Sequence, residues 1–103
     1  MKNNIQKILM INLGLLPNYV GFRYISEGVK CIIESKEHYK ITDLYKEIAR
    51  IYDKKVSQIE SGIRNAKAKI DYNSVTAKEY NINPKMANGE LLYVLAMDIG
   101  ELF

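Results

Sequence analysis

An all-α fold is what this sequence predicts: a single compact domain over residues 1–103, with about five to six helices and a helix-turn-helix at about 41–70. Apolar residues recur at helical spacing through most of the chain, and no run shows the alternation typical of a strand. With 48% apolar and 26% charged residues, the 103 residues are enough to build one hydrophobic core.

The first two helices are expected to form a platform. Asn3 or Asn4 can cap a helix that ends at Gly14, and Asn18 can cap a second helix that runs to about Ser35. The apolar positions are Ile5, Ile8, Leu9 and Leu13 in the first helix, and Tyr19 or Val20, Phe22, Ile25, Val29, Ile32 and Ile33 in the second.

Two glycines lie inside the second helix, at Gly21 and Gly28. A glycine weakens a helix by about 1 kcal/mol relative to alanine. We therefore expect both to mark places where another helix comes close.

The helix-turn-helix is predicted from two apolar stripes that a polar break at residues 53–55 separates. The stripes are Leu44, Ile48, Ile51 and Tyr52 before the break, and Val56, Ile59, Ile63, Ala66 and Ile70 after it. Asp53 tolerates the left-handed backbone that a sharp turn needs. Thr42 can cap the first of the two helices, with Asp43 in its first turn.

The second helix of this pair, residues 56–70, has a polar outward face on a helical wheel. A helix in the major groove needs donors and acceptors for base edges, and small residues where its backbone comes close. The first need is met by Gln58, Arg64 and Asn65, and the second by Ser57, Ser61 and Ala68. An ordinary solvated helix face is the competing interpretation.

Positive charge is concentrated in the same region. Between Lys46 and Lys69 there are seven basic residues against three acidic ones, a net of +4, while the whole chain carries +3. The basic residues are Lys46, Arg50, Lys54, Lys55, Arg64, Lys67 and Lys69, and the acidic ones are Glu47, Asp53 and Glu60. This concentration is the electrostatic pattern of a nucleic-acid contact.

The last third of the chain is predicted to hold two more helices. Ser74 can cap a short helix over residues 75–80, and Pro84 makes residues 81–85 a turn. Asn88 can then cap a final helix whose apolar positions are Leu91, Leu92, Leu95, Met97 or Ile99, and Leu102, with Tyr93, Val94 and Phe103 beside them. Such a wide apolar arc fits either core packing or a partner interface.

Catalytic and metal chemistry have no support in the sequence. There is no glycine-rich phosphate loop and no Cys/His cluster at metal spacing. Cys31, the only cysteine, excludes an internal disulfide and is expected to be a small core residue. His38, the only histidine, lies in the polar connector 36–40 without a partner at ligand spacing. We expect no enzyme, no catalytic residue, no cofactor and no metal.

The sequence also indicates where in the cell the protein is expected. No apolar run is long enough to cross a bilayer, and the amino terminus lacks the order of a signal peptide. We therefore expect a cytoplasmic protein without a membrane partner.

Several runs of residues together resemble a known family. They are residues 13–14 (LG), 21–27 (GFRYISE), 48–52 (IARIY) and 57–66 (SQIESGIRNA), and more weakly 88–92 (NGELL). These runs resemble the C-terminal DNA-binding effector domain of stage zero sporulation protein A, a response regulator of spore formation. The resemblance implies an all-helical domain of about six helices, in which helix 56–70 reads DNA and its neighbours grip phosphates.

The resemblance also implies which residues contact bases. In the family a glutamate and two arginines on this helix do so; Glu60 and Arg64 match the glutamate and the second arginine. Ser61 stands in place of the first arginine, and Gln58 replaces a basic residue. An arginine on guanine contributes about 1–3 kcal/mol of discrimination that serine cannot reproduce, so we expect a changed or relaxed target sequence. The base-contacting set is Gln58, Glu60, Ser61, Arg64 and Asn65, and the phosphate-contacting set is Lys54, Lys55, Ser57, Lys67 and Lys69.

The leading prediction is a sequence-specific DNA-binding transcriptional regulator with double-stranded DNA as its partner. A homodimer through the final helix is a secondary expectation, because palindromic or tandem sites need two copies. The alternative is a protein-protein interaction module or antagonist that has lost specific DNA binding.

Control and activation are expected to depart from the family. There the effector domain follows a phosphorylated receiver domain, which we expect this protein to lack. The family counterpart of residues 71–88 engages the RNA polymerase sigma subunit and is several residues longer. A sigma contact is therefore the weaker expectation, and repression or simple occupancy of DNA is favoured.

Overall fold

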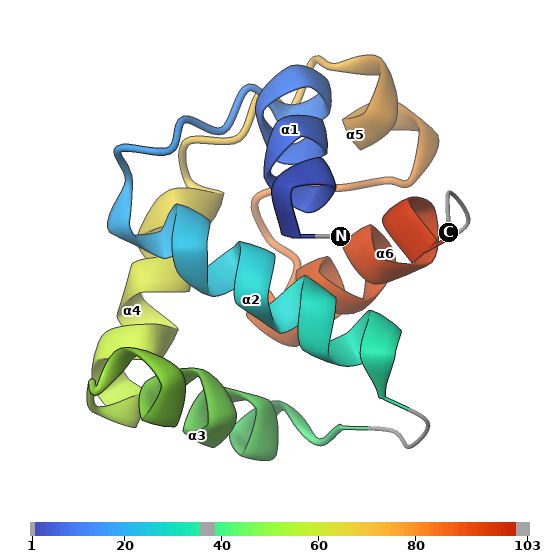
Figure 1. Ribbon diagram of the computed structural model, residues 1–103. Coiled ribbons are helices and arrows are strands. Elements are labelled where there is room, and N and C mark those ends of the chain that lie inside the picture. Colours follow the sequence, from blue (N-terminus) through green and yellow to red (C-terminus); the bar gives the residue numbers. More distant parts are fainter. Residues whose placement is uncertain (1, 36–38, 101–103) are drawn as a thin grey trace.

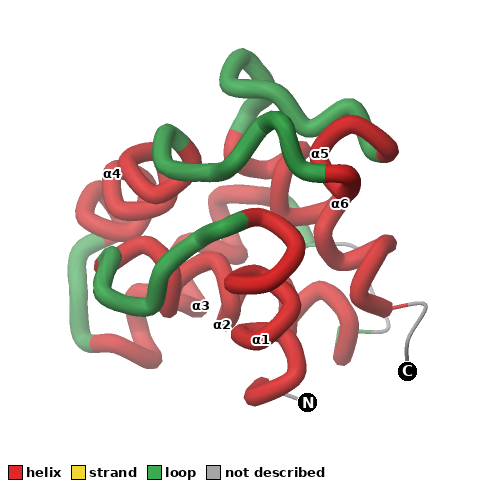
Figure 2. The backbone as a smooth tube through the Cα atoms, turned by 90° about the horizontal axis from the view of Figure 1, so that it is seen from above, coloured by secondary structure: helices red, strands yellow, loops and turns green. Residues whose placement is uncertain are grey.

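The computed structural model of the protein describes residues 2–35 and 39–100 and is all-helical over these ranges (Figure 1). The six helices of the described residues are α1 (Lys2–Leu13), α2 (Val20–Glu34), α3 (Ile41–Tyr52), α4 (Val56–Lys67), α5 (Val75–Glu79) and α6 (Asn88–Gly100). No strand occurs among them, and helices and loops account for the whole described backbone in Figure 2. The predicted all-α fold is confirmed, and α3 and α4 form the helix-turn-helix.

The second helix, α2, lies at the centre of the fold. It packs against α1, α3, α4 and α6, and in Figure 1 it runs diagonally across the molecule between them. Its side toward these neighbours buries Phe22, Ile25 and Val29 almost completely. The short helix α5 packs on α1, at the far side of the molecule from the helix-turn-helix.

The helices α2 and α4 approach each other most closely where two glycines meet. A Cβ atom on Gly21 would lie 2.0 Å from the carbonyl oxygen of Gly62 and 2.6 Å from the Cβ of Ala66. A Cβ on Gly62 would lie 2.8 Å from the ring of Tyr24. The expectation that Gly21 marks a helix crossing is confirmed. Gly28 has a looser contact of the same kind, with Leu92 of α6.

The turn of the helix-turn-helix has the backbone that its sequence predicts. Asp53 is left-handed, with φ 53° and ψ 53°, and the Lys54 N–H donates to the Ala49 carbonyl at 2.9 Å. This bond closes the end of α3 and reverses the chain into α4. Helix α4 ends at Lys67, three residues before the predicted end at Ile70, and its last carbonyl accepts a hydrogen bond from the Tyr72 hydroxyl.

Most of the predicted helix caps are wrong. Helix α1 already includes Asn3 and Asn4, and Asn18 lies in the turn that follows Pro17, so α2 begins only at Val20. Helix α3 begins at Ile41, whose side chain packs on Gly89 of α6, and this places Thr42 inside the first turn.

The cap of α5 is correct, because the Ser74 hydroxyl accepts from the Ala77 N–H at 3.2 Å. Helix α5 ends at Glu79, one residue before the predicted end at Tyr80.

Burial also differs from the prediction at a few positions. Val56 and Ile51 are 39% and 40% exposed, because they flank the turn, where no further helix covers them. Of Tyr19 and Val20, Tyr19 is the one that is half-buried, and Val20 is exposed. Of Met97 and Ile99, Ile99 is the buried residue and Met97 is exposed. Cys31 is half-buried at the edge of the core rather than inside it.

Some predictions fall on residues outside the described ranges. These are His38 with most of its connector, and Leu102 and Phe103 of the final helix. Within the ranges 2–35 and 39–100, every helix is too short or too polar to cross a membrane.

Replacing Gly21 by alanine should destabilise the fold. The added methyl group must displace the α4 backbone, and overpacking of this kind costs about 1–3 kcal/mol or more, whereas alanine gains about 1 kcal/mol of helix propensity. We expect a net loss of about 2 kcal/mol in the free energy of unfolding, measured by urea denaturation.

The matched control is Gly100→Ala, where the new Cβ would have its nearest neighbour, Ile33, at 3.7 Å. Its stability should be unchanged or higher by up to about 1 kcal/mol. Equal stability of the two variants would show that the α2–α4 crossing is not tight.

Candidate nucleic-acid interface

The polar face of α4 is open to solvent. Ser57, Gln58, Arg64, Asn65 and Ala68 are exposed, and Ser61 is half-buried. The opposite side of the helix is fully buried through Ile59 and Ile63. The buried and exposed sides of α4 are therefore the ones that the helical wheel predicts, Val56 excepted.

Two hollows border this face, one on each side of α4. On the side that we call the α2 flank, Asn65 and Lys69 line a hollow with residues 19–21 at the start of α2. On the other side, which we call the α6 flank, Glu60, Arg64 and Lys67 line a hollow with residues 87–89 at the start of α6. The predicted contact residues on α4 are thus divided between the two flanks and the ridge between them.

Arg64 is held by an acidic residue of its own helix. Its Nη1 donates to both carboxylate oxygens of Glu60, at 2.7 and 2.8 Å. Both side chains remain substantially exposed, 57% for Arg64 and 38% for Glu60. An exposed pair at this helical spacing is worth about 0.3–0.5 kcal/mol, so Arg64 can exchange Glu60 for another acceptor at little cost.

Ser61 and Gln58 make local hydrogen bonds that determine what they can offer a base. The Ser61 hydroxyl donates to the Ser57 carbonyl at 2.6 Å, which leaves its lone pairs as acceptors. The Gln58 Oε1 accepts from the Lys55 N–H at 2.9 Å and so closes the start of α4, which leaves the amide NH₂ as a donor.

The lysines predicted to contact phosphates differ in exposure and in whether their ammonium groups already make a hydrogen bond. Lys54 and Lys55 are exposed in the turn before α4, and Lys69 is exposed in the turn after it. Lys67 differs, because it is half-buried and its Nζ donates to the Met86 carbonyl at 2.7 Å. In this arrangement Lys67 ties α4 to the segment before α6, so a phosphate would have to compete with a carbonyl for it.

A buried amide joins α4 to α3 and α6. Asn88, predicted as the cap of α6, lies inside the helix and is 8% exposed. Its Nδ2 donates to the Tyr45 hydroxyl at 3.1 Å and to the Glu60 carbonyl at 3.2 Å. Burial raises the pKa of Tyr45, so this hydroxyl keeps its proton at neutral pH. The cap prediction was wrong because an asparagine before an apolar run also suits a tertiary hydrogen bond.

Arg23 of α2 is a basic residue near this interface that the sequence did not single out. Its guanidinium lies 5.5 Å from the ring centroid of Tyr52, the last residue of α3. The nearby Arg50 is instead bound to Glu47 at 2.6 Å, and this bond lowers the pKa of Glu47. No local sequence pattern reveals Arg23, because its position beside Tyr52 depends on how α2 and α3 pack together.

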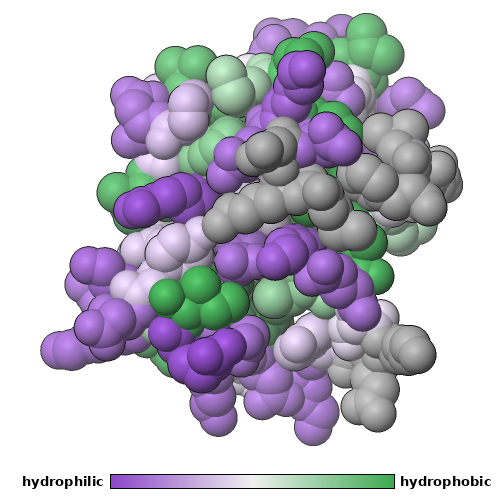
Figure 3. All heavy atoms as spheres, viewed as in Figure 1, coloured by the Kyte–Doolittle hydropathy of each residue, from purple (hydrophilic) through white to green (hydrophobic). Residues whose placement is uncertain are grey.

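The hydropathy of the surface agrees with this placement. In Figure 3, hydrophilic residues dominate the left edge of the view, where α3 and α4 meet in Figure 1.

Across the part of the chain that the structure describes, no group of three or more His, Cys, Asp or Glu side chains could hold a metal ion. Burial, followed by the charge of Glu27, raises the pKa of the Cys31 thiol to about 11, which makes it a poor nucleophile.

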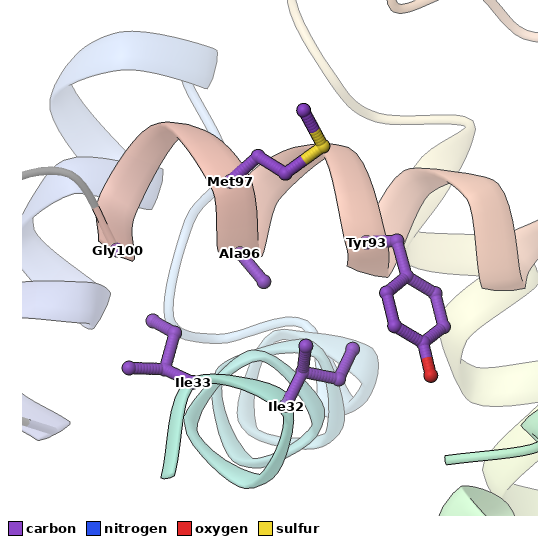
Figure 4. Close-up of a pocket in the computed structure, with 6 residues that line it drawn as sticks. All are labelled: Ile32, Ile33, Tyr93, Ala96, Met97 and Gly100. Carbon is purple, nitrogen blue, oxygen red and sulfur yellow. The ribbon is translucent and has the colours of Figure 1, made fainter. Parts of the chain in front are cut away.

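A groove lies between α2 and α6, at the end of α2 that is farther from α4 (Figure 4). Its floor is Ile32 and Ile33 of α2, and Ala96 points toward them from α6, whereas Met97 points away and is 64% exposed. The wide apolar arc of the final helix thus serves the core and leaves a strip at the surface.

Comparison with known proteins identifies one family. Residues 5–99 match the family model described as "Sporulation initiation factor Spo0A C terminal". No curated protein and no solved structure matches the chain.

Replacing Asn88 by alanine should loosen α4 from α3 and α6. Two hydrogen bonds are lost, and the Glu60 carbonyl and the Tyr45 hydroxyl lose a buried donor, which costs about 1–3 kcal/mol. The free energy of unfolding should fall by this amount in chemical denaturation. The control is Asn73→Ala in an exposed loop, which should change stability by less than about 0.5 kcal/mol.

Proposed function

The chain belongs to the family of Spo0A C-terminal domains, a DNA-binding family of sporulation regulators, and we propose that it is a sequence-specific transcriptional regulator that reads the major groove with α4. The proposal rests on the exposure of the polar face of α4 and on its low content of acidic residues. That face is not packed under any other described helix, and Glu60 is its single acidic residue. A duplex can therefore reach it without displacing part of the protein.

The proposed base contacts are Gln58, Glu60, Ser61, Arg64 and Asn65. Arg64 supports the assignment best, because its side chain is 57% exposed and its exposed pair with Glu60 is weak. Arginine forms two hydrogen bonds with the O6 and N7 acceptors of guanine. Glu60, once released, can accept from the amino group of cytosine.

Ser61 changes the expected target, because its hydroxyl proton is already used within the helix. As an acceptor it suits a base with an amino group in the major groove, adenine or cytosine, where an arginine would favour guanine.

The proposed phosphate contacts are Lys54, Lys55, Ser57, Lys67 and Lys69. Lys54, Lys55 and Lys69 lie at the two ends of α4, where the strands that border a groove would pass. Lys67 is the weakest of the five because it binds the Met86 carbonyl. A homodimer through α6 and a contact with the polymerase sigma subunit stay predictions.

The proposal is tested by selection of genomic DNA fragments with the protein, followed by sequencing, at low and moderate salt. A DNA reader should enrich a subset of fragments with a shared motif, and its affinity should fall steeply with salt. An interaction module would enrich none. In that case the exposed Met97 beside the α2–α6 groove makes self-association, measured by size-exclusion chromatography, the next property to examine.

Arg64→Ala and Lys55→Ala should weaken binding in different ways. Loss of Arg64 should relax specificity at one base position by about 1–3 kcal/mol. Loss of Lys55 should instead weaken the binding of all sequences and lower the salt exponent of the binding constant by about one. Binding isotherms on the selected site, on its single-base variants and on random duplex separate the two. If both variants lose affinity equally on selected and random duplex, the base-reading assignment of Arg64 is wrong.

Ser61→Arg should add a guanine preference at one position of the selected motif. The long side chain replaces an acceptor by a fork of donors, which is worth about 1–3 kcal/mol on the matched base. Repeating the selection with this variant checks the change. Ser61→Ala is the control, and it should lose the preference for adenine or cytosine without gaining guanine.

A further inference from the structure

We infer that Arg23 of α2 binds a DNA backbone phosphate from outside the helix-turn-helix, and that the ring of Tyr52 holds it in position to do so. The inference rests on the proposed function, since it assigns a further contact to the same duplex. It adds a cation on the α2 flank to those at the ends of α4.

Arg23 lies against the ring of Tyr52 and is otherwise exposed. Its guanidinium carbon lies 5.5 Å from the Tyr52 ring centroid, within the range of a cation–π contact. Such a contact leaves N–H groups of the guanidinium available, and these can bind two oxygens of one phosphate.

The ring beneath Arg23 is itself packed against other side chains. Tyr52 meets Tyr24 edge to face, with ring centroids 5.4 Å apart, and the ring of Tyr24 lies against Gly62 of α4. Arg23 is therefore connected through two packed rings to the middle of α4. Its position is set relative to the polar face of that helix, not by a flexible loop.

Arg23 also lies close to cations that are already proposed to bind phosphate. Tyr52 directly precedes the turn that carries Lys54 and Lys55, and Lys69 lies on the same flank of α4. Figure 1 shows the start of α2, the end of α3 and the start of α4 on one side of the molecule. One DNA strand passing this side would meet Arg23 together with the turn.

The electrostatics favour an anion at this position. Arg23 is exposed, and among the described residues no acidic side chain forms an ion pair with it. Arg50 and Arg64 differ, since each is bound to a glutamate of its own helix. Glu27, one helical turn after Arg23, is turned into the protein and lies 3.9 Å from Lys30. Arg23 can thus accept a phosphate without breaking an ion pair.

The test compares the full chain with Arg23→Gln and Arg23→Lys on the selected DNA site and on random duplex. Arg23→Gln should weaken binding by the same factor on both duplexes and reduce the salt exponent of the binding constant by about 0.9. Arg23→Lys should keep the salt exponent but bind more weakly than arginine, because lysine lacks the fork. Lys78→Ala, an exposed cation on α5, is the matched control and should change neither quantity.

A second measurement locates the phosphate. When neutral methylphosphonates replace single phosphates along the site, one position should remove the difference between the unmodified protein and Arg23→Gln. The role of the Tyr52 ring is tested with Tyr52→Leu, which removes the ring and should weaken binding when residue 23 is arginine but not in the Arg23→Gln background.

The outcomes separate the two proposals. If the unmodified protein selects no DNA, the proposed function is wrong. If it selects DNA but Arg23→Gln retains its affinity and its salt exponent, the Arg23 inference alone is overturned. An effect of Arg23→Gln on the selected site but not on random duplex would also overturn it, since a phosphate contact acts on every sequence.

Discussion

The close crossing of α2 and α4 at Gly21 and Gly62 is the constraint on which the rest of the structure depends. A methyl group on Gly21 would lie 2.0 Å from the Gly62 carbonyl oxygen, so the two backbones touch without side chains between them. The crossing fixes the rotation of α4 about its axis. Gly62 faces α2, Ile59 and Ile63 face the core, and Arg64 is left on the open side. Buried packing, not the polar residues themselves, decides which side chains a duplex can reach.

A second attachment holds α4 from its other side. Asn88 and Lys67 join it to the start of α6 through hydrogen bonds to backbone carbonyls, and Tyr45 adds a link to α3. The polar contacts that hold the helix are buried or half-buried, whereas those of its polar face, such as the pair of Arg64 with Glu60, are exposed. Exposed pairs are weak, while removal of a partner from a buried polar group is costly. The helix is thus held firmly while the side chains of its polar face stay free to change partners.

The sequence predicted the fold more completely than the site. Apolar spacing located α2, α3, α4 and α6, because burial of a stripe is a property that repeats along the helix. The caps were mostly missed, since the same short polar side chains serve turns and tertiary contacts: Asn18 follows Pro17 in a turn, and Asn88 binds Tyr45 across 43 residues of sequence. For the site, the wheel identified the exposed face of α4. It could not identify the hydrogen bond of Lys67 to Met86 or the contact of Arg23 with the Tyr52 ring, because both depend on how separate segments meet.

The arrangement of the arginines has a consequence for selectivity. On α4 the hydroxyl of Ser61 is occupied within the helix, and a cation lies at Arg23 on α2. A base contact by arginine adds about 1–3 kcal/mol to one sequence only, whereas a phosphate contact adds equally to all of them. If the proposed contacts hold, positive charge at the border of the polar face would add to the binding of every sequence and so lower the ratio of specific to non-specific binding. A protein of this kind would depend on several adjacent sites, or on a second copy of itself, to select one position among many.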